Sequence, residues 1–293
     1  MNILTIDLEE WFHILDHPST DNESSWDNFE FRLRKNLDRV LDLLNDSDNI
    51  ATFFCLGWVA RKYPDIIKEV SSLGHEIGSH SNAHQLIDRH DRNFFRNDLE
   101  ISIKSLEDIT GKKVISYRAP GFSLVANTMW AFDELVKQGI EYDCSIFLGN
   151  HSHGGRIKSF GLYPSIINIE GKTIKEFPVN SFKFLKKEVP FSGGGYFRLL
   201  PYQVIKRLMR NSEYNMVYFH PRDFDKGQPI IKDLSYYRLF KSYYGLKSSF
   251  PKAVKLLNNF DFVTLSHADK LIDWDRAQQF NLINGNLQLA NYL

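Results

Sequence analysis

Residues 51–80, ATFFCLGWVARKYPDIIKEVSSLGHEIGSH, contain the pattern that decides the fold class. Residues 51–56 are an apolar run of strand length. Residues 59–73 have the composition of a helix that Gly74 ends, and residues 75–79 have the composition of a second strand. A strand, a helix and a strand in this order predict a β-α-β unit, in which the two strands run parallel.

The same alternation continues on both sides of this unit. Further strands are expected at residues 2–6, 114–117, 142–146, 216–219 and 262–265, and further helices at residues 29–44, 94–109, 126–137, 201–210, 234–244, 251–258 and after 267. We therefore predict an α/β fold, a distorted (β/α) barrel, in a single domain over residues 1–293.

Two segments break the alternation. Residues 149–198 are rich in Gly, Ser, Pro and aromatic side chains, which predicts an inserted loop region with local β structure at residues 166–169 and 174–178. The tri-glycine at residues 193–195 is interpreted as a turn. The last dozen or so residues, rich in asparagine, are expected to be a loosely held tail.

Composition narrows the function classes. Lys plus Arg and Asp plus Glu number 36 each, so the formal net charge is zero and no basic stripe favours nucleic acid. We expect no membrane span and, because no signal peptide is apparent at Met1, a cytoplasmic protein. The two cysteines, Cys55 and Cys144, lie in apolar runs and are expected to be reduced core residues.

Polar clusters follow several of the predicted strands. The strand at residues 2–6 is followed by Asp7, Glu9 and Glu10, three carboxylates that suit metal binding or general base work. In a β/α barrel the carboxyl ends of the strands converge on one face, where active sites lie. The clusters are therefore expected to meet there.

Two histidines follow the strand at residues 75–79. His80 and His84 would lie on one side if the chain turned helically after the strand. With one carboxylate they would complete a three-ligand site for a divalent metal, with Zn²⁺ as the favoured ion. Alternative histidines, judged weaker, are His75, His90, His151 and His153.

Two further strand ends carry ionisable side chains. Arg118 is followed by Pro120 and Gly121, and it could orient a carboxylate through a two-pronged hydrogen bond. His220 follows the strand at residues 216–219 and precedes a proline, a position from which it could act as a general acid.

These clusters, in this order, resemble the motifs of the NodB-homology polysaccharide deacetylases, carbohydrate esterase family four. ATFFCLG from Ala51, GHEIGSH from Gly74 and FHPRDFD from Phe219 are similar to family segments. SGGGYFRLLP from Ser192 resembles a bacterial subgroup tied to surface and exopolysaccharide loci. The likeness runs from Ile3 to about His220.

The resemblance implies a metal-dependent hydrolase that removes an N-acetyl group from an amino sugar of a bacterial surface polysaccharide or its precursor. It implies Asp7 as base, oriented by Arg118, Glu9 with His80 and His84 as metal ligands, and His220 as general acid. The family's adjacent aspartate pair is replaced here, so Asp7 and Glu10 stay open as alternative ligands. The family's tryptophan-containing motif is missing.

Other features of the expected site follow more loosely. Asp143 is the candidate for a supporting carboxylate, and a backbone N–H near Phe122 is a candidate oxyanion donor. The segment from Gly193 to Arg198 is expected to shape the sugar pocket, with Tyr196 or Phe197 stacking on the sugar.

The implied substrate is an N-acetylated carbohydrate, and nucleotide-linked and lipid-linked sugars are candidate forms of it. Two other readings remain: an amidohydrolase acting on a formamido sugar or cyclic ureide, and a non-catalytic carbohydrate-binding protein.

Overall fold

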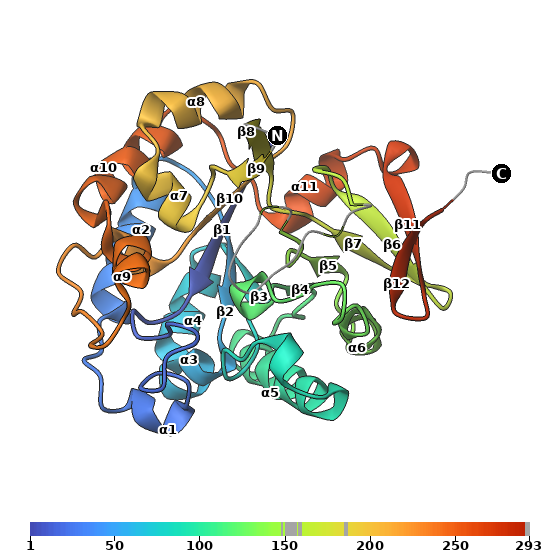
Figure 1. The fold of residues 1–293 in the computed structure, drawn as a ribbon, viewed down its shortest axis with the longest axis horizontal. Helices are drawn as coiled ribbons and strands as arrows, with labels where there is room; N and C mark the ends of the chain where they lie inside the picture. The colour runs from blue at the N-terminus through green and yellow to red at the C-terminus, as the bar shows by residue number, and fades with distance from the viewer. Residues whose placement is uncertain (148, 150–156, 158–159, 185–186, 291–293) are drawn as a thin grey trace.

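The computed structural model describes residues 1–147, 149, 157, 160–184 and 187–290. Most of its strands belong to one sheet (Figure 1). The strands are β1 Asn2–Leu8, β2 Thr52–Cys55, β3 Glu76–Ser79, β4 Ser116–Tyr117, β5 Tyr142–Asp143, β6 Ser165–Ile169, β7 Lys172–Glu176, β8 Ser181–Phe184, β9 Lys187–Pro190, β10 Asn215–Phe219, β11 Gln278–Ile283 and β12 Asn286–Leu289.

Helices surround this sheet (Figure 1). The α-helices are α1 Glu23–Trp26, α2 Leu33–Asp46, α3 Gly57–Lys62, α4 Pro64–Ser72, α5 Arg92–Thr110, α6 Ala131–Lys137, α7 Gly194–Leu199, α8 Tyr202–Arg210, α9 Tyr236–Tyr243, α10 Leu246–Leu257 and α11 Leu265–Leu271. Short 3-10 turns occupy Ile87–Arg89, Pro120–Phe122, Pro221–Phe224 and Trp274–Arg276.

The predicted parallel sheet is confirmed. Strands β10, β1, β2, β3, β4, β5 and β7 are neighbours in this order, and each pair is parallel. Asn180, which follows β7, bridges the two ends of this row. Its side-chain oxygen accepts from the N–H of Met216, a residue of β10, at 3.0 Å. The row and this bridge form the distorted barrel, and its strand ends carry the site.

Outside the barrel the sheet continues as an extension. Strand β6 is antiparallel to β7, β11 is parallel to β6, and β12 is antiparallel to β11. The prediction of a loosely held tail is therefore wrong for residues 278–289, because their backbone groups are paired in the sheet. The expected insertion, residues 149–198, does contain local β structure, in β6 and β7. It is more than an inserted loop, because β7 belongs to the parallel row.

Three predicted elements end differently. The helix expected over residues 59–73 is two helices, α3 and α4, because Pro64 starts a new helix at its first position. The tri-glycine is not a turn, since α7 begins at Gly194. The strand expected at residues 262–265 is reduced to one bridge between Val263 and Ile3.

Side-chain alternation along β1 divides the core in two. Leu4, Ile6 and Leu8 belong to the large cluster beneath the helices. Ile3 belongs to a smaller cluster inside the barrel, which also contains Phe54, Cys144, Met216 and Tyr218. Both cysteines are buried and reduced, as expected. Odd-numbered residues of β1 therefore face the barrel interior. The single domain stays a prediction.

Candidate metal centre and active site

Two of the three N-terminal carboxylates lie inside the barrel mouth. Thr5 and Asp7 both accept hydrogen bonds from Arg118, at 2.8 and 2.7 Å, and Glu9 follows two residues on. Glu9 is buried beside His84 and His220. Burial by itself raises the pKa of Glu9, but these two histidines outweigh it and hold that pKa below its usual range.

Glu10 also follows the end of β1, but its side chain has other partners. One of its oxygens accepts from the N–H groups of Arg32 and Leu33, at 2.6 and 2.7 Å, where α2 begins. The other oxygen accepts from the Trp11 N–H at 3.0 Å. Glu10 therefore stabilises the positive end of a helix, and its oxygens are already used.

His80 and His84 meet through a loop and not through the helical turn that the sequence predicted. Ser81 and His84 have positive φ angles of 66° and 52°. Asp98 holds the loop, accepting from the N–H groups of Asn82 and Ala83 at 2.7 and 3.0 Å. The rings of His80 and His84 lie 5.3 Å apart between centroids.

The loop also needs a glycine beside it. Gly57 donates its N–H to the Ser81 carbonyl at 2.9 Å. A Cβ atom at Gly57 would stand 2.6 Å from the Asn82 side-chain oxygen and 3.1 Å from the Asn82 Cα. Only glycine permits this approach, so Gly57 of the ATFFCLG segment keeps the histidine loop in place.

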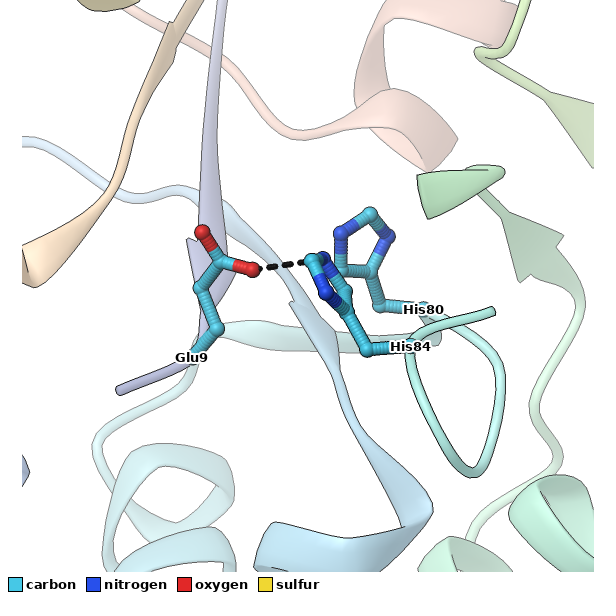
Figure 2. A group of neighbouring side chains, drawn as sticks. All are labelled: Glu9, His80 and His84. Atoms are coloured by element: carbon cyan, nitrogen blue, oxygen red, sulfur yellow. Dashed lines mark ion pairs between the residues drawn. The ribbon is translucent and has the colours of Figure 1, made fainter. Parts of the chain in front are cut away.

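Glu9, His80 and His84 form a group whose ligand atoms lie within 4.8 Å of one another, and all three side chains are buried. Figure 2 shows the three side chains pointing toward one another from the end of β1 and the loop after β3. Glu9 Oε2 lies 2.7 Å from His84 Nε2, yet it makes no hydrogen bond to any residue that the structure describes.

The chemistry of this group fits a divalent metal. His80 Nδ1 lies 2.7 Å from the Arg118 carbonyl. A carbonyl only accepts, so His80 Nδ1 carries the proton and the Nε2 lone pair is left for a ligand. Burial lowers the pKa of His80 to about 4, which keeps the ring neutral. Two imidazoles, one carboxylate and open positions are the donor set of catalytic zinc sites.

Asp7 lies next to this group and is held by Arg118. The Arg118 guanidinium is fully buried, and it also donates to Thr5 and to the Cys144 carbonyl, the latter at 3.3 Å. The expected two-pronged contact is wrong, because a single guanidinium nitrogen reaches Asp7 Oδ1. Asp7 Oδ2 instead faces His220 Nε2 at 3.6 Å.

His220 completes the site from the end of β10. Its Nε2 lies 3.5 Å from Glu9, and its Nδ1 lies 3.0 Å from Asp223 Oδ2. Burial lowers the pKa of His220, but Glu9, Asp223 and Asp7 outweigh it and raise it to about 9. Burial raises the pKa of Asp223, whereas Arg198 and His220 bring it down to about 2. The ring is therefore protonated and oriented.

A cleft of about 890 Å³ opens over these residues. The predicted segment after Gly193 does line it, as α7. Tyr196 faces the cleft, but Phe197 does not: it is fully buried and packs on Phe219 with ring centroids 4.8 Å apart. The N–H of Phe122 donates to the Ala119 carbonyl at 3.0 Å, so this group is engaged and is not an oxyanion donor.

Comparison with known proteins places the chain in a family. Residues 19–140 match the polysaccharide deacetylase family, and residues 144–270 match a domain of unknown function, DUF3473. Residues 19–140 therefore form a domain of the polysaccharide deacetylase family, the NodB-homology family that the motifs resemble.

Individual relatives in this deacetylase family match over short stretches. Two peptidoglycan-N-acetylglucosamine deacetylases from Bacillus cereus are 30% and 34% identical over 97 and 83 residues. These alignments cover 33% and 28% of this chain and 35% and 38% of those proteins, so the chain matches little more than a third of their length.

A solved structure supports the fold of this deacetylase family member. A crystal structure of a Mycobacterium smegmatis protein assigned to the polysaccharide deacetylases superposes with a TM-score of 0.65 at 16% identity. It covers 99% of this chain and 94% of the other. At this identity the comparison concerns the fold alone.

Three buried groups near the candidate metal centre were not assigned a role from the sequence. Asp223 and Arg198 orient His220, and only the i+3 spacing of Asp223 after His220 could have indicated it. His13 lies over His84 with ring centroids 5.6 Å apart. Its Nδ1 accepts from the Glu10 N–H at 3.2 Å, and its buried Nε2 has no hydrogen-bond partner in the described part of the chain.

Asp143 supports the site from a distance. It accepts from the Ser145 hydroxyl at 2.7 Å, and that hydroxyl accepts from the Ala119 N–H, next to Arg118, at 2.8 Å. Asp143 is the register partner of Glu176 on β7, and both carboxyls are fully buried. Burial raises the pKa of each, and that of Glu176 well above its usual range.

The two alternative histidines that the structure describes, His75 and His90, lie away from this arrangement. His75 Nδ1 accepts from the Ala51 N–H at 3.4 Å at the far end of β2, and His90 stacks on Phe94 at 3.8 Å. His151 and His153 lie outside the described residues. No helix in the described part of the chain is long and apolar enough to cross a membrane.

Proposed function

We propose that this chain is a metal-dependent carbohydrate N-deacetylase that acts on an amino sugar of a bacterial surface polysaccharide or its precursor. The observation that carries the proposal is one cluster at the strand ends. Glu9, His80 and His84 lie within ligand distance of one another, and His220 faces both Glu9 and Asp7 beside them. Family membership supports the same reaction.

Zn²⁺ is our proposed ion, held by Glu9, His80 and His84. When bound, such an ion lowers the pKa of a water ligand and polarises the acyl oxygen of the substrate. The remaining chemistry belongs to the protein. Asp7, as base, takes a proton from the attacking water, and its ion pair with buried Arg118 holds the carboxylate in position.

His220 acts as the acid in this scheme. An amine is a poor leaving group unless it is protonated, and His220 Nε2 faces the space beside Asp7 and Glu9. Asp223, bonded to Nδ1, keeps the ring positively charged and fixes its direction. In this scheme Asp7 removes a proton from the water, and His220 delivers one to the leaving nitrogen.

The test is acetate release by the zinc-loaded protein from N-acetylglucosamine oligomers and from peptidoglycan fragments. We expect His84→Ala to lose both bound metal and activity, and Asp7→Asn to keep the metal but lose activity. Retained activity in metal-free His84→Ala would overturn the metal-dependent mechanism. Release of formate from formamido sugars, with no acetate released from N-acetylated ones, would overturn the assignment of the acyl group.

A further inference from the structure

Helix α9 presents an aromatic face to the cleft and not to the core. Tyr237 and Phe240, at spacing i and i+3, share one side of the helix. Tyr244 directly follows the helix, and its ring packs against that of Phe240 with centroids 4.7 Å apart. Their side chains are 70%, 50% and 49% exposed, and all three line the cleft that contains Asp7 and His220. The helix itself has no buried residue among its eight, all of which the structure describes.

Polar contacts from other elements hold this helix in position, and its half-buried Leu239 and Tyr243 pack against the core. Arg198 of α7 donates to the carbonyls of Ser242 and Lys241 at 2.7 and 2.8 Å. Arg238 donates to the Asp16 carbonyl at 2.6 Å, across the cleft mouth. Figure 1 shows α7 and α9 beside each other, consistent with these bonds. Because Arg198 also contacts Asp223, the aromatic face is tied to the group that orients His220.

We propose that Tyr237, Phe240 and Tyr244 form a stacking platform for sugar units of a glycan chain beyond the unit that reacts, so that the substrate is an oligosaccharide or polymer. The inference rests on the proposed deacetylase function. Flat aromatic rings stack on the apolar faces of sugar rings, while polar neighbours bond the hydroxyls. Arg222, Arg238 and Ser242 line the same cleft and supply such groups.

Two observations favour a glycan over other occupants. The platform is continuous with the reactive site, and the cleft of about 890 Å³ is near the upper end of pocket sizes for drug-sized ligands, roughly 300–1,000 Å³. A single sugar would leave most of it to water. A lipid chain would favour an aliphatic lining, whereas this wall alternates aromatic rings with Arg222, Arg238 and Ser242.

The test compares N-acetylglucosamine oligomers of two and five units. For the wild type we expect kcat/KM to rise with length. In Tyr237→Ala and Phe240→Ala the gain from length should fall about three- to tenfold for each variant, the loss expected for one aromatic contact. Tyr163→Ala is the matched control, because Tyr163 is 55% exposed and does not line the cleft.

Other outcomes would overturn the platform. No length dependence in the wild type, or equal losses on short and long oligomers, would do so. So would a dimer in light scattering that Phe240→Ala breaks, or binding to lipid vesicles that Tyr237→Ala abolishes. Calorimetric binding of the pentamer separates the two proposals. If the wild type binds the pentamer but releases no acetate, and Tyr237→Ala weakens that binding, the deacetylase proposal fails and the platform stands.

Discussion

Glu9 and Glu10 are neighbours in sequence with opposite surroundings, so the same substitution at each position tests which of them is the metal ligand. Glu9 faces His84, while Glu10 accepts from the N–H of Trp11 and from two backbone N–H groups at the start of α2. We expect Glu9→Gln to fold and lose metal. We expect Glu10→Gln to bind metal and lose stability.

The size of each effect follows from the contacts. In Glu10→Gln an amide nitrogen must face the N–H of Trp11 or those of Arg32 and Leu33, which leaves at least one buried hydrogen bond unmade at a cost of about 2 kcal/mol. For a chain of this size the melting temperature should fall by about 4–8 °C. Glu9→Gln removes a ligand charge, so metal affinity should fall by more than the roughly 10–100-fold typical of outer-shell changes.

The assay measures thermal unfolding with and without Zn²⁺, together with metal content after dialysis. Zn²⁺ at about one hundred times its Kd stabilises the wild type by about 2.7 kcal/mol. Glu10→Gln should keep this increment from a lower starting point, and Glu9→Gln should lose it. Loss of the increment in Glu10→Gln, with the increment intact in Glu9→Gln, would refute the assignment of Glu9 as ligand.

Three further outcomes are expected. Asp223→Asn should lower kcat about 10- to 100-fold while metal content stays constant, because His220 loses its partner; lost metal would contradict this. Arg118→Met should leave Asp7 buried without its cation and cost about 3–5 kcal/mol in chemical denaturation, so an unchanged midpoint would count against it. Glu176 has a raised pKa in the fold, so its contribution to stability is complete below pH 4.5 and is lost as pH rises toward the folded pKa. Glu176→Gln should flatten that decline above pH 4.5, and an unaltered slope would exclude the carboxyl as its cause.

Much of the architecture could be predicted from residues 51–80 and their repeats. Apolar periodicity reports which faces are buried, and that is sufficient to predict parallel strands and crossover helices. It does not report which strands pair when their residues are polar. The asparagine-rich end of the chain therefore predicts a loose tail, although β11 pairs with β6 there. The site residues were also foreseen as a group, because strand ends converge in a barrel.

The geometry within the site needed the fold. The sequence predicts that a helical turn brings His80 and His84 together, and this is wrong. They meet through a loop that Asp98 and Gly57, from other elements, hold in shape. The i+3 spacing of Asp223 after His220 was the one hint of its role in the sequence. The platform on α9 was beyond sequence reasoning, because its position depends on contacts between residues far apart in the chain, such as Arg198 and Ser242, 44 positions apart.

The sequence by itself determined which chemical groups gather at the barrel mouth: carboxylates after β1, histidines after β3 and β10, and an arginine after β4. Only the tertiary structure decided which carboxylate does what. Glu9 and Glu10 are adjacent, and both follow the last residue of β1, so the alternation of the strand does not assign their directions. One faces the histidines and the other the start of α2, a distinction that depends on where the neighbouring elements lie in space.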